Sequence, residues 1–538
     1  MAHASSSLIR AWHIFLLAVP LVLTSYRVAT DDTGLDAITP QASYTVTLQM
    51  GMEPAGGSVY ATTYLPASTE RQPVKTLASR SGPFSLEIKT DSTGQHARWS
   101  ADEVTGAQRI AYSFRVWPKP VAYQLDDVQR RSTDVSVPPS LQPYLRATAA
   151  IPADAPYIEA LYERVAPDTD RLPKTVQALF DHAASLEPAA FSGGLDAIAA
   201  DRLGRASCNG VSRLLVALAR QAQIPSRLVG GLILEDGTTA TSHQWAELYI
   251  GGHWVPFDAL NGHFAALPAN YLTLYRGDEF LFSHTPDIAF DYQFDIEQHW
   301  TSEREAAAVM ASTPGEAYGF WAPLVEAGLS LDLLEILLLL PLGASIVVFF
   351  RNVVGLETYG TFLPALIASA CLATGLTWGL LAFFTVTLTV AALHVPLERA
   401  GILHTPRLAI LMVFVVVQLI LLTLLSAHLG WLDLSYFILF PVVILTSTAE
   451  RFASHLTEDG PAKAAKVTLM TGGVIGCSYA VMDLPIVGLT MLAFPETLLL
   501  IVAFNLWLGR WVGIRLTEYA RFRWLINRQT TTYASSSR

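Results

Sequence analysis

The chain has 538 residues, of which 51% are hydrophobic and only 15% are charged. This composition is too apolar for an ordinary soluble protein and too charged for one buried wholly in a membrane, so both kinds of segment are expected. Residues 27–330 carry 35 acidic against 22 basic side chains, and this negative surplus excludes bulk neutralisation of nucleic-acid phosphates.

The first apolar segment is AWHIFLLAVPLVLTS, residues 11–25, which follows Arg10. Its length suits a secretory signal or a short signal anchor. No convincing small-residue cleavage site follows it. We therefore interpret residues 1–26 as an uncleaved signal anchor and expect the chain after it to be exported.

Residues 40–130 show the pattern of a β-rich module. The stretches YTVTLQM and RIAYSFRVW alternate or carry β-branched and aromatic residues, and EPAGGS and DSTG read as turns between strands. We predict a small β-sandwich-like module here. The segment VPPSLQP (137–143) reads as a proline-rich linker.

From about residue 144 the pattern becomes helical, and the stretch SCNGVSR (207–213) is predicted to begin a helix. Ser207 is a candidate N-cap and Pro225 a stop signal. One helix face collects the apolar side chains at i, i+3, i+4 and i+7, namely Val211, Leu214, Leu215 and Leu218. Cys208 then lies in the first turn, where the helix dipole and free N–H groups favour a thiolate and can stabilise an oxyanion.

Two strand-like runs, HQWAELYI (243–250) and HWVPFDAL (253–260), are joined by Gly-Gly, which predicts a hairpin with a two-residue turn. In this register Ile250 pairs with His253. His243 and Asp258 then share one face as diagonal neighbours within side-chain reach. A slip of one residue would place them on opposite faces.

The order Cys208, His243, Asp258 is that of a nucleophile, a general base and an orienting carboxylate, as in papain-like or transglutaminase-like triads. The chain resembles the transglutaminase-like core over about residues 145–290. The resemblance lies in the helix after the cysteine leading to Ile224-Pro225-Ser226-Arg227, in His243 with Trp245, and in Trp254 with Asp258. It implies an α+β papain/transglutaminase-like exported domain, which we place at residues 144–300.

Seven apolar runs follow the exported half, near 330–350, 360–375, 378–395, 408–427, 432–449, 467–483 and 495–513. If residue 27 lies outside, every Lys and Arg after residue 330 falls on the inner side, as the positive-inside rule requires. We therefore predict an all-α seven-helix transmembrane bundle at 329–515. Residues 27–328 would be periplasmic and the basic tail 516–538 cytoplasmic.

The whole chain resembles a bacterial membrane family described as an inactive transglutaminase fused to seven transmembrane helices. The helical half is similar in RNVVGLETYGTFLPALIASA (351–370), FPVVILTSTAERF (440–452) and GRWVGIRLTEYARFRW (509–524). The resemblance implies an inner-membrane location, a degraded site that often lacks the histidine, and partnership with ATP-grasp peptide ligases. This chain departs from that pattern because it keeps cysteine, histidine and aspartate.

Two hypotheses follow. The first is a cysteine acyl-transfer enzyme acting on peptide or isopeptide amides, with either water or an amine as acceptor. The second is a non-catalytic peptide-binding or scaffolding domain coupled to the helical bundle, with Cys208 a small buried core residue. Both expect a peptide or protein substrate and the lipid bilayer as partners. No HxxxH or CxxC spacing predicts a metal, and no cofactor is expected.

Overall fold

The computed structural model divides into two compact units. The helical unit comprises Met1–Pro40, Ser302–Glu305 and Gly315–Arg538, and the α/β unit comprises Gln41–Thr301 and Ala306–Pro314. The structure describes residues 2–30, 37–54, 56–125, 137–166, 172–190, 196–305, 321–327, 329–429, 451–453, 455–511, 513–519 and 521.

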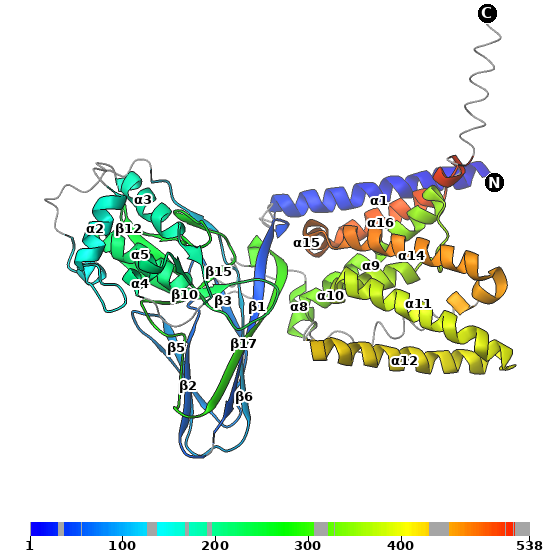
Figure 1. Ribbon diagram of the computed structural model, residues 1–538. Helices are drawn as coiled ribbons and strands as arrows, with labels where there is room; N and C mark the ends of the chain where they lie inside the picture. Colours follow the sequence, from blue (N-terminus) through cyan, green and yellow to red (C-terminus); the bar gives the residue numbers. More distant parts are fainter. Residues whose placement is uncertain are drawn as a thin grey trace, which may run out of the picture. The chain divides into compact units, whose positions relative to one another are not determined.

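Two sheets form the β-rich module of the α/β unit, in the orders β11-β17-β1-β6-β3 and β16-β2-β5-β4 (Figure 1). Side chains alternate between a buried and a more exposed position along β1 and β6. The strands are β1 (Pro40–Glu53), β2 (Val59–Leu65), β3 (Val74–Arg80), β4 (Ser85–Thr90), β5 (Gln95–Ala101), β6 (Gln108–Val116), β11 (Gly237–Thr239), β16 (Phe282–His284) and β17 (Ala289–Ser302). The predicted module at 40–130 is therefore completed by three strands from much later in the chain.

The first and last long strands of this unit, β1 and β17, are neighbours in the sheet. Ser43 Oγ donates to the carbonyl of His299 at 3.4 Å, and Thr301 Oγ1 donates to the carbonyl of Gln41 at 3.4 Å. These two contacts show that the strands are antiparallel, so the start of β1 lies beside the end of β17. Trp117 Nε1 also donates to Thr301 Oγ1, at 3.0 Å.

The second part of the α/β unit packs helices on a sheet of order β13-β12-β10-β15, the α+β arrangement expected from the sequence (Figure 1). Helix α5 lies against β10 and β12, and all its residues from Gly210 to Arg220 are buried. The elements are η2 (Gln142–Leu145), α2 (Pro156–Val165), α3 (Leu172–Ala184), α4 (Ala197–Leu203), α5 (Cys208–Gln221), β10 (Ser226–Ile233), β12 (His243–Ile250), β13 (His253–Phe257) and β15 (Tyr271–Arg276), with two-residue strands β7 (Val121–Ala122), β8 (Glu187–Pro188), β9 (Arg205–Ala206) and β14 (Ala266–Leu267).

The predicted hairpin register is confirmed. Ile250 pairs with His253, and the ladder continues to Ala246 opposite Phe257. Gly251 and Gly252 have φ of 62° and 91°, and a two-residue turn with both residues at positive φ twists in the sense that the flanking strands require. The side chains of β12 therefore alternate as predicted, with even positions packed against α5.

The helical unit contains α1 (Ala2–Thr30), α8 (Ala322–Glu326), α9 (Leu331–Phe349), the π-helical turn η4 (Phe350–Val354), α10 (Leu363–Thr374), α11 (Leu376–Arg399), α12 (His404–Leu429), α14 (Pro461–Met482), α15 (Pro485–Ala493), η6 (Pro495–Thr497) and α16 (Leu498–Leu508) (Figure 1). Within the described residues, three helices are long and apolar enough to cross a membrane, or four if a bent pair is one span. The coarse prediction of a helical, apolar C-terminal half is confirmed. The number seven is not established, and the predicted span 432–449 lies outside the described residues.

Two details of the helical unit differ from the simple spans that were predicted. The last predicted span, 495–513, is an 11-residue helix, α16, which with the preceding α15 forms a pair bent by 104°. Pro485 and Pro495 begin the two segments, as expected from a residue that cannot continue a helix but fits its first turn. The N-terminal helix α1 packs against α16, and Arg27 pairs with Glu496 at 3.2 Å.

Candidate active site

The hairpin brings His243 and Asp258 into direct contact. His243 is the first residue of β12, and Asp258 directly follows β13. The imidazole Nε2 lies 2.7 Å from Asp258 Oδ2, and the side chains are 10% and 1% exposed. Two charged groups this deeply buried need several hydrogen bonds to offset the loss of water.

Asp258 receives those hydrogen bonds from two further side chains and from the backbone. Tyr271 Oη donates to Oδ2 at 2.7 Å, and Asn261 Nδ2 donates to the same oxygen at 2.9 Å. The N–H groups of Leu260 and Asn261 donate to Oδ1 at 3.1 and 3.3 Å. The carboxylate is thus held in one orientation, with both oxygens satisfied.

Cys208 is the first residue of α5, as the sequence predicted. Ser207 occupies the N-cap position, but its side chain makes no capping hydrogen bond. The Cys208 thiol donates to Asn209 Oδ1 at 3.1 Å, and Cys208 is one of the groups that raise the pKa of His243. The helix is tied to the strand beside this contact, because Ser212 Oγ donates to the carbonyl of Gln244 at 3.0 Å.

The electrostatics favour a protonated imidazole. Burial acts to lower the pKa of His243, but the hydrogen bonds to Asp258 and Cys208 and their negative charges outweigh it and raise the pKa to about 9. For Asp258, burial acts to raise the pKa, yet the hydrogen bonds from His243, Tyr271 and Asn261 leave it below its ordinary value. An imidazolium that a carboxylate orients beside a cysteine is an arrangement suited to acid–base chemistry at that cysteine.

The structure thus gathers all three predicted site residues. Two positioning residues, Tyr271 and Asn261, were missed by sequence reasoning. The spacing Asp-x-x-Asn carries a local signal, because a carboxylate at a turn often accepts from the backbone two or three residues on. Tyr271 carries none, since β15 reaches the site only through its non-local pairing with β10.

Other polar residues near the site form structural pairs. Arg213 pairs with Asp278 at 2.6 Å, and Arg227 pairs with Glu247 at 2.6 Å. Among the residues that the structure describes, no group of three or more His, Cys, Asp and Glu side chains could hold a metal ion.

Comparison with known families places this geometry in a class. Residues 158–259 match the transglutaminase-like superfamily, so the helices and sheet around Cys208 and His243 form a transglutaminase-like domain. Residues 327–526 match a family described as seven transmembrane helices usually fused to an inactive transglutaminase. The resemblance stated from the sequence is confirmed, and the chain is a multi-pass membrane protein that joins both regions.

Comparison with solved structures adds two distant likenesses, and no curated protein matches the chain. A protein from Cytophaga hutchinsonii, named provisionally as a cysteine protease, is 17% identical with a TM-score of 0.41, covering 49% of this chain and 91% of its own. A protein from Parabacteroides distasonis, named provisionally as a protease, is 12% identical with a TM-score of 0.18, covering 39% and 43%. At these scores neither likeness carries an argument.

Proposed function

We propose that the transglutaminase-like domain is a cysteine acyl-transfer enzyme that cleaves or transfers peptide or isopeptide amides. One observation carries the proposal: Asp258, itself fully hydrogen-bonded, holds one nitrogen of His243, and Cys208 at the start of α5 is close enough to raise the pKa of the same imidazole. A purely structural histidine needs no thiol at a helix start, and a purely structural cysteine needs no oriented imidazole.

The proposed reaction proceeds through a thioester. The Cys208 thiolate attacks the amide carbonyl carbon, and N–H groups at the start of α5 stabilise the oxyanion. The C–N bond then breaks as the imidazolium of His243 gives its proton to the departing amine. Nε2 is occupied by Asp258, so Nδ1 is the nitrogen that carries this proton. Water or an amine next attacks the thioester, His243 takes a proton from it, and the thiolate is released.

The cellular setting is part of the same proposal. Residues 1–26 serve as a signal anchor, residues 27–328 lie outside the bacterial inner membrane in the periplasm, and the C-terminus is cytoplasmic. The asymmetric distribution of Lys and Arg after residue 330 supports this orientation. The substrate is a peptide or protein, and an ATP-grasp peptide ligase is the proposed partner system.

A second candidate is favoured by one finding, the description of the helical family as usually fused to an inactive transglutaminase. In that case the domain binds peptides without reacting and works as a scaffold coupled to the helices. The two candidates differ in a single measurable property, the nucleophilicity of Cys208.

The test measures the rate at which iodoacetamide alkylates Cys208 in the full chain in detergent, followed by peptide mapping. We expect fast alkylation near pH 7 that falls at least tenfold in His243→Gln, because the variant loses the imidazolium that stabilises the thiolate. His96→Gln is the matched control. It removes a His–Asp pair of similar geometry, Nε2 to Oδ2 of Asp91 at 2.8 Å, from β5 of the same unit.

Equal alkylation of Cys208 in the wild-type chain and in His243→Gln would overturn the enzyme and favour the scaffold. A second assay identifies the acceptor. A glutamine peptide is incubated with and without a fluorescent amine, and the products are separated by mass. Amine incorporation that Cys208→Ala abolishes identifies a transglutaminase, and hydrolysis alone identifies an amidase or peptidase.

A further inference from the structure

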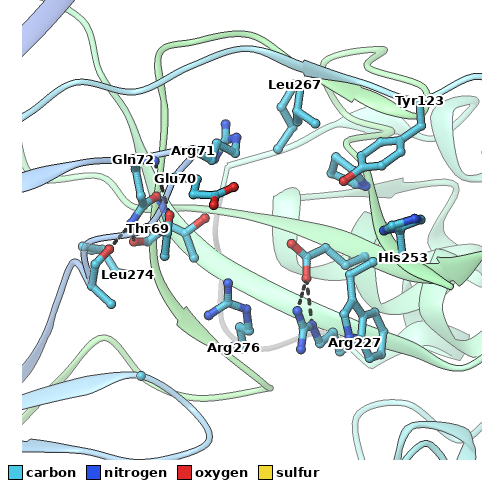
Figure 2. A pocket seen from close by; sticks show the side chains of 17 residues that line it. Thr69, Glu70, Arg71, Gln72, Tyr123, Arg227, His253, Leu267, Leu274 and Arg276 are labelled. Atoms are coloured by element: carbon cyan, nitrogen blue, oxygen red, sulfur yellow. Dashed lines mark hydrogen bonds and ion pairs between the residues drawn. The ribbon is translucent and has the colours of Figure 1, made fainter. Parts of the chain in front are cut away.

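The α/β unit contains a second polar site, a cavity of about 470 Å³ that does not include Cys208, His243 or Asp258 among its lining residues. A volume of this size suits a small ligand or the end of a peptide. Its walls come from the loop before β3 and from β10, β12, β13 and β15 (Figure 2). All of them belong to the same unit.

The cavity and the candidate active site lie on one face of β10 and β12, separated by a packed row. Along this ladder Arg227 pairs with Glu247, then Val229 with Trp245, then Gly231 with His243. The first row lines the cavity, and the middle row is fully buried with Leu267 and Tyr271. The first and third rows are four residues apart, roughly 13 Å at about 3.3 Å per strand residue. A ligand in the cavity therefore does not occupy the reaction site.

Three guanidinium groups lie around this cavity, from Arg71, Arg227 and Arg276 (Figure 2). Arg227 is held in place by two neighbours. Its Nε donates to Glu247 Oε2 at 2.7 Å, and its Cζ lies 4.0 Å from the ring centroid of Trp254. The negative charge of Glu247 acts on Arg71 and Arg276 as well. One half-buried carboxylate is thus the shared counter-charge of three half-buried guanidinium groups. Glu70, the other acidic residue that lines the cavity, is exposed.

The two remaining arginines keep unused donors. Within the described part of the chain, Nε of Arg71 and Nε of Arg276 are buried without a hydrogen-bond partner. Burial also lowers the pKa of both guanidinium groups, which reflects the cost of holding them charged there. Buried donors and uncompensated charge of this kind are costly unless a ligand satisfies them.

The cavity wall is rigid where it presents Arg71. The neighbouring Gln72 is 3% exposed, and its amide donates to the carbonyls of Ala67 and Thr273 and accepts from the Thr273 N–H. These hydrogen bonds fasten the loop to β15, which also carries Arg276. The two guanidinium groups are therefore presented from fixed backbone positions, the arrangement that a preorganised anion site requires.

We propose that this cavity binds the carboxylate of a small acidic ligand of about dipeptide size, held by Arg71 and Arg276. Guanidinium groups match carboxylates because their planar N–H forks donate two parallel hydrogen bonds. Arg227, already paired with Glu247, fixes the cavity wall and adds positive field. The site is separate from acyl transfer, so it stands whether or not Cys208 reacts.

Binding is measured by isothermal titration calorimetry on the full chain in detergent, in a Cys208→Ala background that prevents any reaction. The probes are glutamyl-glutamate, the same dipeptide with its three carboxyls converted to amides, and inorganic phosphate. We expect saturable binding of glutamyl-glutamate and at least tenfold weaker binding of the amide. Arg71→Gln and Arg276→Gln should each weaken glutamyl-glutamate at least tenfold.

Arg109→Gln is the matched control, because Arg109 is an exposed arginine of β6 in the same unit and does not line the cavity. It should bind like the parent. Circular dichroism of each variant confirms that it is folded. The proposal is overturned if glutamyl-glutamate does not bind, if its amide binds equally, or if either cavity variant binds like Arg109→Gln. Binding of phosphate without binding of glutamyl-glutamate would overturn the choice of carboxylate.

Discussion

The two ends of the β10–β12 ladder carry polar clusters that differ in how their charges are balanced. At the His243 end, Asp258 accepts from His243, Tyr271, Asn261 and two backbone N–H groups. At the Arg227 end, a single half-buried carboxylate serves three arginines, and two of them keep buried Nε donors without partners among the described residues. In the two functions proposed above, the cluster whose hydrogen bonds are satisfied takes part in a reaction, and the cluster with unpaired donors binds a ligand.

The most severe test of this contrast removes the acceptor at the centre of the satisfied cluster. Asp258→Ala leaves a buried imidazole and several donors unpaired, so we expect about 3–5 kcal/mol of lost stability and at least a hundredfold slower alkylation of Cys208. Hydrogen exchange of β12 amides in the full chain measures the first effect. Asp102→Ala, an exposed aspartate of the same unit, serves as control. Unchanged protection in Asp258→Ala would show that the cluster is not coupled to the fold.

Because His243 is charged in the folded chain, the stability of the fold should depend on pH. The pKa is raised from 6.5 to about 9 in the folded chain, so protonation stabilises the fold by roughly 3 kcal/mol. A raised pKa makes this contribution complete below pH 6.5 and removes it as the pH rises through 9. The difference in β12 exchange free energy between the wild-type chain and His243→Gln should shrink over that window. A constant difference from pH 6 to 9.5 would contradict the imidazolium assignment.

Tyr271 tests the positioning shell. Tyr271→Phe removes a hydrogen bond to a charged acceptor, for which we expect about 2 kcal/mol of lost stability. Because Asn261 and the backbone still hold Asp258, alkylation of Cys208 should slow only severalfold. A readout specific to positioning is the pH profile of alkylation, which should shift in Tyr271→Phe. A stability loss with an unshifted profile would assign Tyr271 a packing role only.

The smallest expected change in stability has the opposite sign, because the substitution should stabilise the fold. Arg276→Gln removes a half-buried cation that shares its counter-charge with two others, so in the absence of ligand it should stabilise the fold by about 1 kcal/mol. Hydrogen exchange of β15 amides provides the measurement. If Arg276→Gln destabilises β15 as much as Tyr271→Phe destabilises β12, the two ends of the ladder do not differ in how well their charges are balanced.

The part of the site that the sequence predicted is the part set by local geometry. A Gly-Gly turn sets the register of one hairpin, and the register sets the face on which His243 and Asp258 lie. The start of α5 at Cys208 likewise follows from apolar spacing in a short window. The three residues meet because α5 packs on β12, and the order of the motif already suggested that packing.

The remainder depends on contacts between distant segments. Arg71 and Arg276 lie about two hundred positions apart in sequence, so no spacing relates them. The same holds for Tyr271 and for β11, β16 and β17, which complete the module although they lie far from residues 40–130 in the sequence. The bend between α15 and α16 escaped prediction for a different reason. An apolar run shows that a segment avoids water, but its hydropathy does not show where the helix bends or in which direction it continues.

The pairing of β1 with β17 has a mechanical consequence. Because the two strands are antiparallel and the long segment Gln41–Thr301 of the unit begins in one and ends in the other, tension on the chain at these two points would act at the same end of the pair. It would open hydrogen bonds one after another from that end, beginning beside Gln41 and Thr301. The sheet that carries His243 would stay unloaded until the outer pair had parted.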